Sequence, residues 1–262
     1  MEIIQFDVSG KFAHFRKYYA NNTALSFSIP PRTTLMGMLA GMLGLPKDSY
    51  YEGLASDKIR IGIAVKTPLK KSFHRLNLLS IKSKGDLKKS FESDFRGMNG
   101  HIQTPLEVIS GENIHTDEIC YRVFVSYFEA GKALFEALRH RLEKRDRHFQ
   151  TTLGTAQFLA TVNNYYFFDG VKAYTSQEDW VEFHSAIISD HVSALDFQRE
   201  NLQHFVEEEL LPADFKANYD RELSKMNRVL FTTGNIPLKV KYTGKYFELR
   251  SQTERQTIRF LE

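Results

Sequence analysis

Cysteine is almost absent from this 262-residue sequence, in which Cys120 stands alone. No disulfide can form within the chain, and neither a zinc ribbon nor another cysteine-based metal site can be built. Proteins of the cytoplasm, where thiols stay reduced, rarely rely on disulfides. This absence therefore favours a cytoplasmic protein.

Long apolar runs are missing as well. The most apolar segment, residues 35–45, is far shorter than the roughly 20 residues that a membrane-spanning helix needs. The first ten residues alternate apolar and polar side chains and include Glu2 and Asp7, which is unlike the profile of a signal peptide. We expect no association with a membrane.

The motifs of several enzyme classes are also lacking. Gly37, Gly41 and Gly44 are not followed by the Lys-Ser/Thr pair of a nucleotide-binding P-loop. The nine histidines form no His-Glu-x-x-His motif. No Gly-x-Ser-x-Gly turn occurs, and Cys120 lies in an apolar segment that indicates packing rather than nucleophilic chemistry. We therefore predict no catalytic residue, no metal and no cofactor.

What the sequence does contain is an uneven distribution of charge. Hydrophobic residues make up 42% and charged residues 26%, as in folded domains, and the net charge is only +3. Residues 58–96 carry eleven Lys or Arg and three acids, whereas residues 178–222 carry three basic residues and twelve acids. The basic half could follow RNA phosphates, and the acidic half could face away or contact a basic neighbour. Two ordinary solvated faces of opposite sign are the alternative.

Apolar periodicity in the first two-thirds of the chain predicts a sheet with two helices. We expect strands at 2–8, 58–67, 73–81, 105–109, 119–127 and 156–162, and helices at 35–43 and 129–147. The strand at 73–81 is predicted to pair with the strand at 58–67, and residues 82–103 to form a mobile excursion. This order is that of a ferredoxin-like α+β domain, the architecture of RNA-recognition modules. We assign it to residues 1–162.

Residues 163–262 are predicted to form a smaller, mostly β lobe. Short aromatic strands are expected at 165–168, 171–174 and 181–188, an acidic helix at 194–210, and paired strands at 228–232, 238–242 and 246–249. The sequence contains no internal repeat.

Three segments have the chemistry of phosphate contacts. Arg32, Thr33 and Thr34 lie at a predicted helix start, where free backbone N–H groups favour an anion. A cation at that end is unfavourable unless an anion or an acidic side chain compensates it. Basic residues surround the strand at 73–81 and continue into the excursion, although a solvated hairpin is an alternative. The turn at 151–157 is rich in hydroxyls and contains Gly154, so a backbone can approach it closely.

Four blocks of the sequence resemble a known family. The first is Phe15-Arg-Lys followed by residues 25–46, which contain Ser-Ile-Pro-Pro-Arg-Thr-Thr-Leu-Met-Gly, and the others are 101–107, 121–125 and 153–160. In this order they are similar to CRISPR-associated protein family five of the RAMP superfamily, especially its type I-B branch. The resemblance covers residues 1–162 well and the rest loosely.

The resemblance implies a subunit of a type I CRISPR interference complex, Cascade. Such a subunit holds the 5′ handle of the guide RNA (crRNA) and caps the backbone filament, beside the large subunit and the first backbone subunit, with target DNA nearby. It implies a thumb hairpin at about 80–103 and a glycine-rich loop at 153–157. We further expect handle bases to lie on side chains of the sheet.

The residue chemistry and the resemblance together give a list of predicted RNA contacts. These are Arg16, Arg32, Thr33, Lys70, Lys71, His74, Arg75, Lys82, Lys84, Lys88, Lys89, Arg96, His101, Gln103, Gly154, Thr155 and Gln157.

One branch of the family cleaves repeat RNA without a metal, using a tyrosine with a lysine and a histidine. This sequence contains no Lys-His dipeptide, although Tyr50 and Tyr51 could imitate the tyrosine. We predict no catalysis, and a metal-independent endoribonuclease is the alternative.

Overall fold

Strands dominate the structure, a computed structural model, and helices are few, so the fold is mixed α and β. The structure describes residues 1–20, 23–79, 81, 83–95, 101–197, 205–216, 221–251 and 254–262. Within these ranges, no helix combines the length and the apolar character needed to cross a bilayer.

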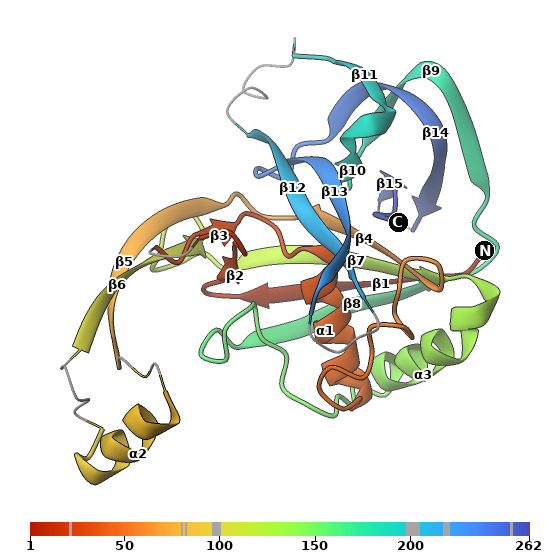
Figure 1. Ribbon diagram of the computed structural model, residues 1–262. Helices are drawn as coiled ribbons and strands as arrows, with labels where there is room; N and C mark the ends of the chain where they lie inside the picture. Colours follow the sequence, from red (N-terminus) through yellow and green to blue (C-terminus); the bar gives the residue numbers. More distant parts are fainter. Residues whose placement is uncertain are drawn as a thin grey trace.

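Four antiparallel strands form the main sheet, which carries the core of the molecule. Their order is β4 (Ile59–Val65), β7 (Ile119–Tyr127), β1 (Ile3–Gly10) and β8 (Ala160–Phe168). Alternate residues of each strand share a face. Ile4, Phe6 and Val8 of β1 therefore pack with the matching residues of β4 and β7 against helices α1 (Arg32–Leu43) and α3 (Lys132–Glu143). The two helices lie on one side of this sheet (Figure 1).

Helix α1 begins after Pro31 and ends at Gly44, which adopts the left-handed conformation that terminates helices. Its two internal glycines differ in their surroundings. A Cβ atom on Gly37 would lie 3.0 Å from the Tyr50 hydroxyl, whereas a Cβ on Gly41 would meet no atom within 4 Å. Gly37 thus allows close packing, and Gly41 borders open space.

Strands β5 (Lys70–Leu79) and β6 (His101–Ser110) pair with each other rather than with the main sheet and form a ribbon that leaves the body (Figure 1). The predicted pairing of residues 73–81 with 58–67 is therefore wrong, because β4 pairs with β7. At the far end of the ribbon lies helix α2 (Lys84–Glu92), inside the segment predicted as a mobile excursion, for which no helix was expected. The Ser83 hydroxyl accepts a hydrogen bond from the Asp86 N–H and begins this helix.

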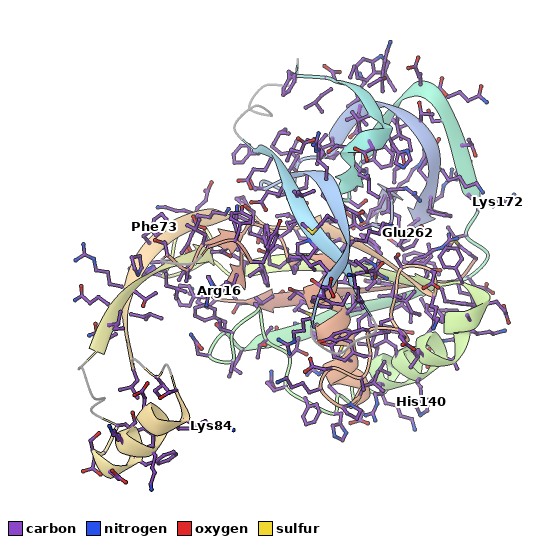
Figure 2. All side chains as sticks on the ribbon, in the orientation of Figure 1. Arg16, Phe73, Lys84, His140, Lys172 and Glu262 are labelled. Carbon is purple, nitrogen blue, oxygen red and sulfur yellow. The ribbon has the colours of Figure 1, made fainter. Side chains whose placement is uncertain are left out.

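A small hairpin lies at the base of the ribbon. It comprises β2 (Phe15–Arg16) and β3 (Ser26–Phe27). Its Ser26 N–H donates to the Glu107 carboxylate on β6 at 2.8 Å. Figure 2 shows Arg16 near the base of the ribbon and Lys84 at its far end.

The remaining strands form two further sheets. One contains β10 (Ile187–Ile188), β13 (Leu223–Thr232) and β12 (Val206–Phe215), and the other contains β9 (Ala173–Phe183), β11 (Val192–Leu195), β14 (Leu238–Arg250) and β15 (Arg255–Ile258). The helix predicted at 194–210 is wrong where the chain is described, because β11 and β12 occupy its two ends. Its middle, 198–204, lies outside the described residues.

Candidate nucleic-acid interface

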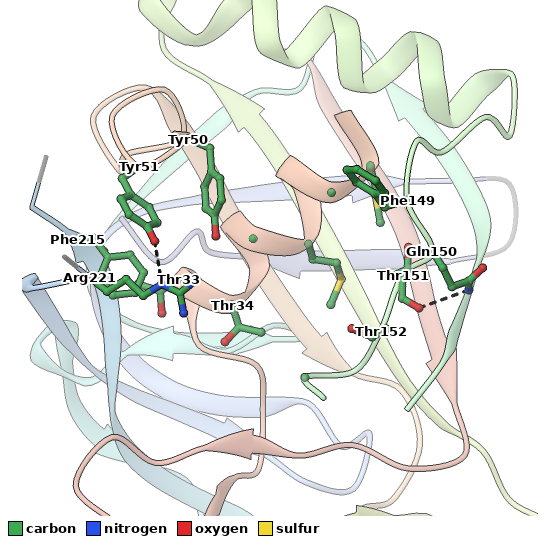
Figure 3. Close-up of a pocket in the computed structure, with 15 residues that line it drawn as sticks. Thr33, Thr34, Tyr50, Tyr51, Phe149, Gln150, Thr151, Thr152, Phe215 and Arg221 are labelled. Carbon is green, nitrogen blue, oxygen red and sulfur yellow. Dashed lines mark hydrogen bonds between the residues drawn. The ribbon is translucent and has the colours of Figure 1, made fainter. Parts of the chain in front are cut away.

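A pocket of about 390 Å³ runs along the first three turns of α1 (Figure 3). The helix contributes Thr33, Thr34 and the open surface at Gly41 to its floor. The turn at 149–154 forms one wall, and the opposite wall comes from Tyr50, Tyr51, Phe215 and Arg221. Three segments that are distant in the sequence therefore meet at one polar cavity.

The helix end in this pocket is suited to an anion. No side chain caps the N-terminus of α1, and its Thr34 N–H donates to the Pro31 carbonyl at 2.9 Å, so the N–H groups of Arg32 and Thr33 are those without an intrahelical partner. The hydroxyl group of Thr151 also lacks a hydrogen-bond partner among the described residues, and its oxygen is screened from solvent. Phosphate oxygens or ribose hydroxyls would satisfy both kinds of group.

The turn at 151–157 holds Gly154 at the rim of the pocket. Gly154 has φ +97°, and a Cβ atom there would lie 1.8 Å from the His14 carbonyl oxygen, so no other residue fits. The turn is anchored by the His14 N–H, which donates to the Leu153 carbonyl at 3.0 Å. Thr155 is half-buried and Gln157 is exposed on the same turn. The structure thus brings Thr33 and Gly154, two predicted contacts, to the same cavity.

A polar cluster forms the opposite wall. Arg221 donates to the Asp48 carboxylate at 2.9 Å and to the Tyr51 hydroxyl at 3.1 Å, and Tyr51 donates to Asp48. Burial and the hydrogen bond to Asp48 raise the pKa of Tyr51 to about 12. The bonds from Tyr51 and Arg221 lower the pKa of the Asp48 carboxyl. Because Asp48 balances Arg221, this wall is polar but close to neutral.

Arg32 is not part of the pocket surface, which corrects its prediction as a phosphate contact. Its side chain is 1% exposed and pairs with Asp214 of β12 at 2.5 Å. The same guanidinium donates to the Leu54 and Ile59 carbonyls at 2.8 and 2.6 Å. A cation at this helix end needs either an anion or an acidic side chain to compensate it. In the structure the acidic side chain of Asp214 does so.

The ribbon presents a row of cations and polar groups at some distance from the pocket. Lys70, His74, Arg75 and Gln103 are exposed on its strands. Lys71 is half-buried, and its ammonium group lies 3.8 Å from the Glu209 carboxylate of β12, so this lysine is partly neutralised. Lys84, Lys88 and Lys89 are exposed on α2.

Three of the predicted contacts fall where no side chain is described. Lys82 and Arg96 lie outside the described residues, and so does the side chain of His101, whose backbone begins β6. Arg16, by contrast, is exposed on β2.

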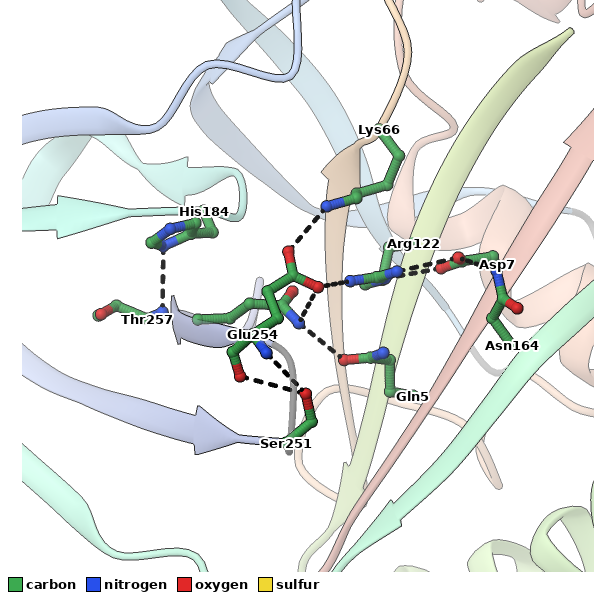
Figure 4. A network of polar contacts seen from close by, with 10 residues as sticks. Gln5, Asp7, Lys66, Arg122, Asn164, His184, Ser251, Glu254 and Thr257 are labelled. Carbon is green, nitrogen blue, oxygen red and sulfur yellow. Dashed lines mark hydrogen bonds and ion pairs between the residues drawn. The ribbon is translucent and has the colours of Figure 1, made fainter.

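The second face of the main sheet is largely covered, which corrects the expectation that handle bases lie on it. Phe124 of β7 packs against Phe247 and Phe260 from the C-terminal strands. Beside them, Arg122 donates to Asp7 at 2.7 Å and to Glu254 at 2.7 Å (Figure 4). This face is therefore an internal interface over β4 and β7.

Sequence reasoning misses most of the pocket. Phe215 and Arg221 belong to the acidic half of the chain, and no local pattern connects them with the helix start at Thr33. The sequence suggests Tyr50 only as a mimic of a catalytic tyrosine. The open surface at Gly41 has a detectable signal, because a glycine inside a helix costs stability and needs a reason.

The family model described as CRISPR-associated protein (Cas_Cas5) matches residues 3–233. No curated protein matches the sequence. Among solved structures, a CRISPR protein from Archaeoglobus fulgidus aligns with a TM-score of 0.54 and 16% identity, over 99% of this chain and 100% of that chain. A chain of a CRISPR RNA-guided surveillance complex aligns with a TM-score of 0.46 and 14% identity, over 91% and 90% of the two chains. The first of these similarities shows a common fold.

Proposed function

The chain belongs to the CRISPR-associated protein family Cas5, and we propose that it is a non-catalytic Cascade subunit that binds the 5′ handle of the crRNA. In this proposal the main sheet with α1 and α3 is a ferredoxin-like unit. The strand-helix-strand, strand-helix-strand order and the sheet order β4-β7-β1-β8 support this assignment. The ribbon with α2 corresponds to the thumb.

One observation carries the proposal: the pocket combines a free helix N-terminus, an unpartnered buried hydroxyl and a glycine turn. The free helix end and the unpartnered hydroxyl do not stabilise the free protein, whereas Gly154 is required by the packing of its turn against His14. The first two features offer donors to a phosphate or a ribose, and the turn with Gly154 forms the adjoining rim of the pocket. An RNA terminus in the pocket would give both donors a partner.

The charged groups outside the pocket extend the same interface. Arg16 and Lys70 lie toward the base of the ribbon, and the lysines of α2 lie at its tip. We propose that the handle runs from the pocket toward the ribbon and that these cations contact its phosphates.

We further propose the assembly that the family resemblance implies. The subunit caps the backbone filament beside the large subunit, close to target DNA, in a cytoplasmic type I complex of subtype I-B. Glu209 of β12 does not face away from the chain, since it binds Lys17 at 2.7 Å. Exposed acids such as Glu208 are expected to contact basic neighbours instead.

The pocket is tested by filling it. Gly41→Leu places a side chain in the open space beside α1, where a Cβ atom would meet no other atom within 4 Å. The variant should bind crRNA at least tenfold more weakly, since the leucine side chain takes up pocket space between α1 and the turn at 149–154. Leucine favours helix over glycine by roughly 1 kcal/mol, so the melting temperature should stay level or rise.

Gly41→Ala is the matched control, because it gains the same helix propensity and adds only one methyl group. The salt dependence of crRNA binding is measured on the same samples together with Lys84→Ala/Lys88→Ala/Lys89→Ala, which should flatten the slope. Unchanged affinity of the leucine variant would remove the pocket from the RNA site.

Catalysis is tested with the repeat RNA in EDTA. We expect no cleavage, because the hydroxyl of Tyr51 is held by Asp48 and its pKa is raised to about 12. A product that ends in a 2′,3′-cyclic phosphate would establish the endoribonuclease alternative instead.

A further inference from the structure

The two edges of the main sheet differ in how the chain covers them. Strand β4 forms one edge, and the N–H groups of Ala186 and Leu261 donate to its carbonyls at 2.7 and 2.8 Å. Strand β8 forms the other edge. Along residues 161–168 the N–H and C=O groups that point away from β1 have no backbone partner among the described residues. The chain therefore closes one edge of its main sheet and leaves the other open.

The open edge lacks the residues that usually protect such edges. Exposed edge strands commonly carry lysine, proline or other charges that discourage pairing with another chain. Residues 157–168 contain neither a charged residue nor a proline, and 165–168 are all aromatic. A bulge at Asn164, which has φ +52°, bends the strand, but β8 pairs with β1 on both sides of it. Strand β8 is thus available to a further strand.

A groove of about 710 Å³ runs along this edge, and one of its walls is formed by five consecutive residues, 162–166. Successive side chains of a strand point to opposite faces. A cavity that touches five of them in a row therefore lies against the edge of the strand and not against one face. The other wall is the end of α3, with Leu142, Glu143, Arg145 and Arg147. The groove offers space for an extended chain between the open edge and the helix end.

The helix wall of the groove is cationic. Arg145 is exposed, and Arg147 is half-buried with its Nη1 atom screened from solvent and without a hydrogen-bond partner. Neither arginine has an ion-pair partner among the described residues, because Glu143 of the same wall binds Arg139 at 2.9 Å and Asp146 is also paired. A buried guanidinium N–H without an acceptor costs stability unless a ligand accepts from it. This wall is therefore suited to a carboxylate.

The side chains of β8 determine what each face of an added strand would meet. Tyr165 and Phe167 lie on the side of α3. The Tyr165 hydroxyl donates to Glu143 at 3.1 Å, and the Cζ atom of Arg139 lies 3.7 Å from the centre of the Phe167 ring. Tyr166 lies on the opposite face and is 48% exposed. An added strand would thus turn one set of side chains toward the arginines and the alternate set toward Tyr166.

We infer that β8 accepts an extended segment of a partner protein as an additional strand, with acidic side chains of that segment bound by Arg145 and Arg147. An RNA strand would use the arginines but would leave the N–H and C=O groups of the edge unpaired. A second copy of β8 would pair with the edge but would bring no acid to the arginines, since residues 157–168 are uncharged. The inference goes beyond the proposed function, because no RNA takes part in it.

The charge of the partner is tested with a peptide and the full chain. The probe is a fluorescent peptide of alternating valine and glutamate, about eight residues long, as strands usually are. Arg145→Glu/Arg147→Glu should bind it roughly tenfold more weakly, and should bind the matching valine-lysine peptide more tightly than the unmodified protein does. Lys132→Glu/Lys172→Glu is the control for net charge, because both lysines are exposed and neither lines the groove.

Strand pairing is tested separately, on the unmodified protein. The N–H groups of alternate peptide residues point to opposite edges, so N-methylation of the valines blocks one edge of the peptide and N-methylation of the glutamates blocks the other. One methylated peptide should keep the affinity of the parent, and the other should bind roughly tenfold more weakly. Hydrogen exchange of the amides of residues 161–168 should slow when the parent peptide binds.

Equal affinities of the two methylated peptides, an unchanged affinity of the arginine variant for the valine-glutamate peptide, or unaltered exchange at 161–168 would overturn the inference. A loss of crRNA binding in the arginine variant would also overturn it and would make the groove part of the RNA site. A dimer of the free protein that protects 161–168 would show a second copy as the occupant instead. The proposed function fails separately, if the unmodified protein binds no crRNA while the peptide results hold.

Discussion

Arg32 illustrates how the same residue at a helix start can have two different roles. Its sequence context, Pro-Pro-Arg-Thr-Thr, matches an anion site equally well with the arginine facing outward or inward. The choice depends on Asp214, which lies 182 positions away and reaches the guanidinium at 2.5 Å. No local pattern contains that information.

This pair gives a prediction about stability. Asp214→Ala should lower the free energy of unfolding by about 3–5 kcal/mol, because it leaves the Arg32 charge buried without its counterion. Urea denaturation at neutral pH measures the loss. The double variant Arg32→Met/Asp214→Leu should recover most of it, since apolar groups of similar volume need no counterion.

An exposed pair serves as the control. Lys216 and Glu222 form an ion pair in which both side chains are about half exposed. Glu222→Ala should change the free energy of unfolding by less than about 1 kcal/mol, because solvent screens such pairs. If Asp214→Ala had an effect as small as this, the description of Arg32 as a buried charge held by Asp214 would be incorrect.

At the scale of secondary structure, the sequence predicts the elements whose apolar pattern faces the core. The alternation in β1 and β4 and the helical periodicity of α1 and α3 all indicate one buried face, and these elements exist. The predicted pairing of the ribbon is wrong because alternation reveals a strand without naming its partner. The acidic segment 194–210 has the composition of a helix, but residues 206–210 belong to strand β12. Glu207 and Glu209 lie on the same side of this strand, and both accept hydrogen bonds from Ser28.

The base of the ribbon contains a group that makes its stability depend on pH. His14 is buried, and its Nδ1 lies 2.7 Å from the Glu107 carbonyl oxygen of β6. Burial, with a smaller effect from Arg16, lowers the pKa of the imidazole below 6.5, although the Glu107 carbonyl and carboxylate act in the opposite direction. The folded protein therefore keeps His14 neutral.

The unfolded chain takes up a proton near pH 6.5, whereas folded His14 does so only at lower pH. Its contribution is therefore complete above pH 6.5 and decreases as the pH falls below that value, by at most about 1.4 kcal/mol per pH unit. Urea unfolding at pH 7.5 and 5.5 measures the difference. His14→Gln should remove most of this dependence, because the amide can donate to Glu107 without titrating. Exposed His140 provides the control, and an equal effect of His140→Gln would contradict the assignment.

At the scale of the whole molecule, the polarised charge of the sequence is largely satisfied within the chain. Glu209 binds Lys17, Asp214 binds Arg32, and Glu254 binds both Lys66 and Arg122. The acidic second half thus neutralises part of the basic first half and joins the two. Among the described cations without an ion-pair partner are Lys70 and Arg75 of the ribbon and the lysines of α2, which are proposed RNA contacts.

The division into residues 1–162 and 163–262 stays a prediction, but both parts contribute to shared cores. Ile188, Leu211 and Phe231 belong to the same buried cluster as Ile61 of β4. Two backbone hydrogen bonds also join the parts, since Ala186 and Leu261 donate to the Ile63 and Ile61 carbonyls at 2.7 and 2.8 Å. We therefore expect the described chain to unfold as one cooperative unit.

Phe260→Ala tests this cooperativity, because Phe260 is fully buried between Phe247 and the main sheet. The cavity should lower the free energy of unfolding by about 3–5 kcal/mol. Fluorescence of Trp180, the single tryptophan, reports on β9 in the second part, and hydrogen exchange of β1 and β7 amides reports on the first. In one cooperative unit the two probes shift together in the variant. A loss confined to the fluorescence transition would show instead that the first part keeps its fold when the second part unfolds. The pocket along α1 has Phe215 and Arg221 in its wall, so its formation would then depend on docking of the second part onto a folded first part.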